Sequence, residues 1–99
     1  MATARNLYPE NTPTTRTPQM CATGWSANPG DPVDWQNPPA NTTVTAVDSN
    51  PAHWPFNLTS GFAYPNTSTV MIRTNAAAGT YSYVVSTCTD LTTKTVTVG

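Results

Sequence analysis

The sequence predicts a single, small, all-β domain, a Greek-key antiparallel β-sandwich or barrel. Three observations predict it. The chain has 99 residues, which is the length of one domain. From residue 20 onward, short stretches of alternating apolar and polar residues are separated by turn residues. No stretch has the 3.6-residue apolar period of an amphipathic helix. An immunoglobulin-like sandwich is the alternative within the same class.

The first 19 residues are expected to form a flexible N-terminal arm, and residues 20–99 the sandwich domain. The arm carries Pro9, Pro13 and Pro18 among Thr, Asn and Arg, without periodicity. Its stretch Arg5-Asn6-Leu7-Tyr8 could dock as a short edge strand. An arm of this kind could also add a strand to the sheet edge of a neighbouring molecule.

The first two strands are expected at Cys21–Ser26 and Val33–Asn37. Between them, Asn28-Pro29-Gly30-Asp31 has Pro and Gly at the two central positions that a type II turn favours. In the second stretch, Val33 and Trp35 fall on one face, which we expect to be buried.

Four more stretches complete the predicted strands, at residues 42–47, 67–73, 80–85 and 92–98, and residues 49–54 are expected to be irregular. In each of the last three strands the apolar residues alternate with polar ones, which predicts one buried face. The residues expected to face inward are Val70, Ile72, Tyr81, Tyr83, Val85, Val96 and Val98.

The two cysteines, Cys21 and Cys88, are predicted to form one disulfide, because the count is even and the chain has the composition of a small secreted protein. This disulfide would close a loop of nearly seventy residues and would stabilise the fold by roughly 4 kcal/mol in the chain-entropy model. Two buried free thiols, or a pair of metal ligands, are the alternatives.

The composition excludes some functions and favours an extracellular location. Charged residues make up 9% of the chain and its formal net charge is −1, whereas ordinary domains are about 25% charged. Four Lys and Arg residues are too few to neutralise a row of phosphates, so we expect no nucleic-acid partner. No apolar run is long enough for membrane insertion. The first 19 residues lack the apolar segment of a signal peptide, so the chain is either a mature form carrying a start Met or a cytosolic protein. We favour a mature extracellular, periplasmic or cell-surface chain.

Two motifs together resemble the cupredoxin family. Residues 30–37, Gly-Asp-Pro-Val-Asp-Trp-Gln-Asn, are similar to the Gly-Asp-x-Val-x-Trp-x-Asn strand of that family. Residues 79–83, Gly-Thr-Tyr-Ser-Tyr, are similar to its Gly-Thr-Tyr-x-Tyr/Phe strand, and residues 94–98 to its last strand. The resemblance covers about residues 20–99 and implies a cupredoxin-like Greek-key fold. Tyr81 fits a tyrosine corner, in which the buried ring directs its hydroxyl to a backbone group.

The resemblance does not extend to the copper site of that family. A type 1 site uses two imidazoles and one thiolate, usually with an axial Met. Val85 stands where the family has its cysteine, residues 86–99 contain neither His nor Met, and residues 41–44 contain no His. His53 is the only histidine. We therefore expect the fold without a metal or another cofactor.

Other site chemistries are less well supported by the sequence. A soft metal such as Cu(I) could use sulfur and imidazole, and the inventory is Met20, Cys21, His53, Met71 and Cys88. The carboxylates lack calcium-loop spacing and are expected at turns and on the surface; they are Asp31, Asp34, Asp48 and Asp90. No nucleophile motif accompanies His53, so we expect no catalytic residues and no enzyme activity.

The aromatic loop is the candidate binding surface, formed by His53, Trp54, Phe56 and Tyr64. Exposed aromatics beside Asn and Asp suit stacking on sugars or docking of a partner, whereas buried ones would plug the sandwich. The leading hypothesis is a non-enzymatic structural or protein-binding module, such as a subunit of a self-assembling surface structure. A carbohydrate-binding module and a soft-metal handler are the alternatives.

Overall fold

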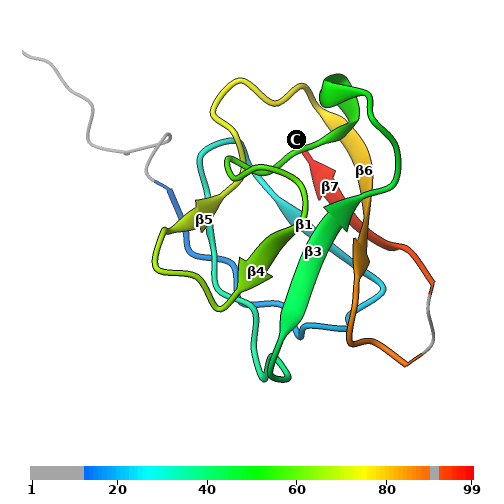
Figure 1. The fold of residues 1–99 in the computed structure, drawn as a ribbon. Helices are drawn as coiled ribbons and strands as arrows, with labels where there is room; N and C mark the ends of the chain where they lie inside the picture. Colours follow the sequence, from blue (N-terminus) through cyan, green and yellow to red (C-terminus); the bar gives the residue numbers. More distant parts are fainter. Residues whose placement is uncertain (1–12, 90–91) are drawn as a thin grey trace, which may run out of the picture.

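The computed structural model describes residues 13–89 and 92–99, which form an all-β domain. The strands are β1 (Gly24–Ala27), β2 (Pro32–Val33), β3 (Thr42–Ala46), β4 (Phe62–Tyr64), β5 (Val70–Met71), β6 (Gly79–Val85) and β7 (Lys94–Val98), with one 3-10 turn, η1 (Pro51–His53). They form a five-stranded sheet in the order β1-β7-β6-β3-β4 and a two-stranded sheet of β2 and β5. In Figure 1, β5 lies on the left and β6 on the right. In the described part of the chain, no helix is long and apolar enough to cross a membrane.

The larger sheet is mixed, which corrects the expectation of a purely antiparallel sheet. β1 pairs with β7 in the parallel direction, with Trp25 opposite Val96, while β3, β4, β6 and β7 pair antiparallel. Parallel neighbours need a long crossover between them. Here the crossover is most of the domain, since β1 is the first strand and β7 the last.

The smaller sheet is extended by residues expected in the flexible arm. The Arg16 N–H donates to the carbonyl of Pro32, and the Asp34 N–H donates to the carbonyl of Arg16, both at 2.8 Å. An isolated parallel bridge joins Gln19 to Gln36. Bridging contacts with the domain, which are isolated and not a regular strand, therefore start at Arg16, within the segment expected to be the arm. The predicted edge strand at residues 5–8 lies outside the described residues.

The core lies between the two sheets and is built from the alternating residues of the strands. Trp35 is buried, and its ring centroid lies 5.1 to 6.2 Å from those of five other aromatic rings. The residues predicted to face inward are all buried, namely Val33, Trp35, Val70, Ile72, Tyr81, Tyr83, Val85, Val96 and Val98. The period of two in the sequence therefore identified the buried face of each of these strands.

Some elements differ in length from the prediction. The stretch expected at residues 67–73 pairs regularly only over β5, and β4 was not predicted at all. β4 follows Gly61, whose φ of 86° reverses the chain, and its three residues are too few to show a periodic pattern. The turn at residues 28–31 is as predicted: Gly30 has φ 85°, and the Asp31 N–H donates to the carbonyl of Asn28 at 3.1 Å.

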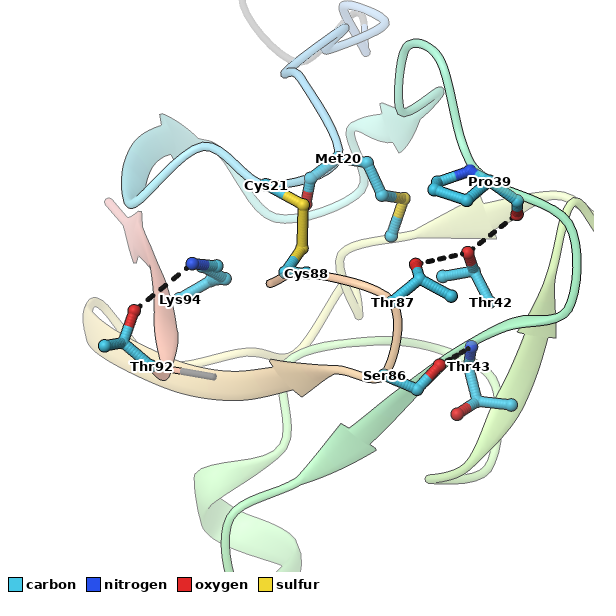
Figure 2. The surroundings of a disulfide bond; sticks show 10 residues. All are labelled: Met20, Cys21, Pro39, Thr42, Thr43, Ser86, Thr87, Cys88, Thr92 and Lys94. Carbon is cyan, nitrogen blue, oxygen red and sulfur yellow. Dashed lines mark hydrogen bonds between the residues drawn. A yellow bond between two sulfur atoms is a disulfide. The ribbon is translucent and has the colours of Figure 1, made fainter. Parts of the chain in front are cut away.

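The predicted disulfide is confirmed between Cys21 and Cys88, which are 67 positions apart in the sequence. Figure 2 shows this bond tying the segment before β1 to the loop after β6. In the same region the Thr42 hydroxyl lies 2.7 Å from both the Pro39 carbonyl and the Thr87 hydroxyl, which satisfies this buried side chain.

Lys94, the only lysine of the chain, is fully buried. It occupies the inward face of β7 together with Val96 and Val98, because alternate residues of a strand share a face. Its Nζ donates to the Thr92 hydroxyl at 3.2 Å (Figure 2). Burying an ammonium group is costly unless it is hydrogen-bonded, which makes this residue a structural element rather than a surface charge.

Candidate functional site

Three of the four residues of the predicted aromatic surface belong to the core. Trp54, Phe56 and Tyr64 are buried, and the Phe56 and Tyr64 rings pack against Trp35 at centroid distances of 5.3 and 5.1 Å. The Trp54 indole N–H donates to the Leu58 carbonyl at 2.7 Å. Rings buried in this way present no open face to a sugar. The alternative considered from the sequence, that the aromatics plug the sandwich, is the arrangement found.

The fourth residue, His53, is exposed at the end of η1 and pairs with Asp48. Its Nδ1 lies 2.8 Å from Asp48 Oδ2, and the two side chains are 57% and 46% exposed. The hydrogen bond with His53, supported by the Asn50 N–H, holds the pKa of Asp48 below its usual value. Within the described residues, no hydroxyl or thiol is hydrogen-bonded to His53. A hydroxyl or thiol nucleophile activated by His53 is therefore not present among the described residues.

The two cysteine sulfur atoms of the soft-metal inventory are bonded to each other. Cys21 and Cys88 form the disulfide, so neither provides a thiolate. Val85, at the position of the cupredoxin cysteine, is buried in the core. Among the described residues, no group of three or more His, Cys, Asp and Glu side chains is arranged to hold a metal ion.

Asp31, expected as a surface turn residue, is instead buried, which corrects that expectation. Its carboxylate accepts hydrogen bonds from the Thr14 N–H at 3.1 Å and from the Asn28 N–H and Arg16 Nε at 2.8 Å each. Burial alone would raise the pKa of Asp31, but these bonds and the Arg16 charge bring it below the usual value. The carboxylate therefore fastens residues 14–16 to the turn before β2.

A groove of about 360 Å³ lies between Asp34 and the loop after β4. The Tyr64 hydroxyl, at its wall, donates to Asp34 Oδ1 at 2.9 Å. Burial and this carboxylate together raise the pKa of Tyr64 to about 12. The hydroxyl is thus occupied within the domain.

The outer edge of β1 is the feature most open to a partner. Thr23 and Ala27 accept hydrogen bonds from the N–H groups of Thr95 and Gly99 on β7. In a parallel pair only alternate residues point their backbone groups to the partner strand, so Trp25 also faces β7, while Gly24 and Ser26 face away. Within the described part of the chain, the N–H and C=O groups of Gly24 and Ser26 have no hydrogen-bond partner.

A groove of about 320 Å³ runs beside this edge, lined by Thr15, Arg16, Thr17, Pro18, Trp25 and Ser26. Its far wall is the segment that pairs with β2 through Arg16 and Pro18, so the backbone groups of Thr15 and Thr17 also point away from β2. Trp25 is half-buried between the two walls and donates its indole N–H to the Tyr83 hydroxyl at 2.8 Å. The groove therefore lies between two strand edges that pair on one side only.

The two edge strands of the large sheet, β4 and β1, differ in whether their outer backbone groups are covered. At the β4 end, the Ala63 carbonyl receives the Asn66 side-chain amide at 3.1 Å. Proteins commonly protect an edge strand with such a cover, with Pro or with a charge. β1, Gly-Trp-Ser-Ala, has none of these. The sequence predicted a strand here but contained no indication that it would lie at an edge.

Comparison with protein-family models, with curated proteins and with solved structures finds no match to this chain.

Proposed function

We propose that this chain is a non-enzymatic structural or protein-binding module of an extracellular or cell-surface assembly, and that it acts by contact through the β1 edge. The observation that carries the proposal lies at this edge beside a groove: the backbone groups of Gly24 and Ser26 have no hydrogen-bond partner among residues 13–89 and 92–99. Main-chain hydrogen bonds to an added strand are a common way for such an edge to bind protein.

The disulfide and the low content of charged residues support an extracellular role. The disulfide indicates a non-reducing environment, since cytosolic thiols are kept reduced. Only 9% of the residues are charged, so few charged side chains are available for contacts. Contacts between such surfaces are not dominated by charge and depend on backbone pairing and shape.

We further propose that the fold is a cupredoxin-like Greek-key sandwich that lacks the copper site. Two observations support this. The Tyr81 hydroxyl donates to the Ala77 carbonyl at 2.6 Å, as expected of a tyrosine corner. Trp35, in the stretch that resembles the first cupredoxin motif, is at the centre of the core. A tyrosine corner also occurs in immunoglobulin-like sandwiches, so the two sequence motifs carry the distinction.

The other candidate functions have less support from the geometry. Sugar binding was expected to use Trp54, Phe56 and Tyr64, which are buried. Of the five residues considered for soft-metal handling, Cys21 and Cys88 are joined in the disulfide. Contact with protein is the function for which a specific surface is available.

Sedimentation velocity under oxidising conditions tests the proposal. We expect the wild-type chain to form larger species as its concentration is raised, because a short edge strand gives a weak and therefore concentration-dependent contact. Copper should leave the sedimentation profile and the visible absorbance unchanged. A chain that stays monomeric at every concentration would refute self-assembly through this edge.

A further inference from the structure

We infer that the β1 edge accepts residues 4–8 of a second copy of this chain, which add as a strand beside Gly24–Ala27 and cover the adjoining groove. This inference rests on the proposed function and names the partner.

The edge requires a short extended segment with free N–H groups. Gly24 and Ser26 together present two donors and two acceptors. At about 3.3 Å per residue, a strand of some five residues spans them. The segment must contain no proline at the pairing positions, because proline has no N–H. One of its alternate side chains should be apolar, since it would lie over the half-buried ring of Trp25 in the groove.

Residues 4–8, Ala-Arg-Asn-Leu-Tyr, meet these requirements. They contain no proline, and Pro9 follows them and ends the possible pairing. Leu7 is the only leucine, isoleucine, valine or phenylalanine among the first 19 residues. Alternation places Leu7 and Arg5 on one face, so that Leu7 would contact Trp25 while Asn6 and Tyr8 face the other way.

The anchoring of Thr14 favours a second copy, and not the same molecule, as the source of residues 4–8. The Thr14 N–H is bonded to the buried Asp31 carboxylate, which also accepts the Asn28 N–H just after β1, so Thr14 is held near the C-terminal end of that strand. To reach its own β1, the segment would have to reverse direction within residues 9–13, which include two prolines. A neighbouring molecule can supply the segment without this reversal.

The resulting assembly is head-to-tail. Each molecule offers one donor segment and one acceptor edge at different places, which is a heterologous contact that can continue into an open chain of subunits. Each contact has only about four backbone hydrogen bonds, and a typical one contributes about 1 kcal/mol net. A single contact is therefore weak, and the assembly should grow with concentration.

The acceptor is tested in the full chain with Ser26→Pro, compared with Ser26→Ala. The Ser26 N–H faces away from β7, so proline removes no hydrogen bond within the domain but blocks the added strand. The Ala variant changes the same side chain and keeps the N–H. We expect Ser26→Pro to sediment as a monomer and Ser26→Ala as the wild type. A Ser26→Pro chain that is folded, by its urea midpoint, and still assembles would overturn the inference.

The donor is tested with Leu7→Asp, which changes no residue of the described domain. We expect this variant to be monomeric, and an equimolar mixture with Ser26→Pro to give a 1:1 dimer, because each variant retains the half that the other lacks. A Leu7→Asp chain that assembles like the wild type would show that another segment, or another protein, occupies the edge, and would overturn the inference.

A peptide of residues 2–10 gives a readout that does not depend on Ser26→Pro folding. Added in excess to the wild-type chain, it should reduce the assembly to monomers, and the same peptide with Leu7→Asp should not. A wild-type assembly that Ser26→Pro abolishes but that the peptide and Leu7→Asp leave unchanged would overturn this inference and leave the proposed function standing, because the β1 edge would still make the contact. A wild-type chain that is monomeric throughout would overturn both this inference and the self-assembling form of the proposed function.

Discussion

Removing the disulfide should destabilise the domain by about 4 kcal/mol. The perturbation is the double variant Cys21→Ala, Cys88→Ala, which keeps the buried Cys88 position apolar. The two cysteines are 67 positions apart. The chain-entropy model gives about 15 cal/mol/K for a loop of that length, which is about 4 kcal/mol at 25 °C. Because domains of this size are stable by only about 5 to 15 kcal/mol, this is a large part of the total.

Urea unfolding followed by tryptophan fluorescence measures the effect. Trp35 and Trp54 are buried, so their emission reports the loss of the core. The oxidised wild type is compared with the double variant and with the wild type reduced by a thiol, which keeps the native sequence. We expect both disulfide-free forms to lose a similar free energy of unfolding, and their m-values to rise as the unfolded chain expands.

A loss below about 1 kcal/mol in both disulfide-free forms would refute the reasoning, because the unfolded chain would then already be restricted without the bond. A large loss in the double variant alone would mean that the alanines disturb the packing around Cys88. A large loss in both forms supports the entropic account.

Three further predictions concern individual polar side chains. Asp31→Asn should cost roughly 3 kcal/mol in urea unfolding, because it removes a buried charge paired with Arg16. Because the pKa of Asp31 is lowered in the folded state, its contribution to stability is present above the unfolded-state pKa and is lost as the pH falls through the folded-state pKa. The variant should therefore lose less stability than the wild type when the pH is lowered. Equal losses in the two proteins would contradict this. Tyr81→Phe should cost about 1 kcal/mol by losing the bond to Ala77, and an unchanged urea midpoint would count against the tyrosine corner. The pKa of Tyr64 is raised to about 12, so the folded state loses stability as the pH rises from 10 toward 12. In urea titrations at alkaline pH, Tyr64→Phe should reduce this loss of stability. The same loss in the variant and the wild type would show that Tyr64 does not cause it.

The candidate site shows where sequence reasoning reached its limit. The sequence placed a strand near Gly24–Ala27 but gave no sign that it would lie at the end of the sheet, which depends on β7, about seventy residues later. It placed the aromatics of residues 54–64 in a loop, and whether a loop lies over solvent or over the core depends on what packs beneath it. Trp35 supplies that packing from another strand.

The sequence by itself determined the all-β class, the inward faces of the alternating strands, the turn at Gly30 and the pairing of the only two cysteines. Each follows from local chemistry, such as the two-residue period of a strand or the positive φ that glycine allows. Three features come from the three-dimensional arrangement alone: the burial of Asp31 and Lys94, the pairing of Arg16 with β2, and the edge of β1 that the other described residues leave open. These depend on contacts between residues far apart in the chain, which a local pattern does not encode.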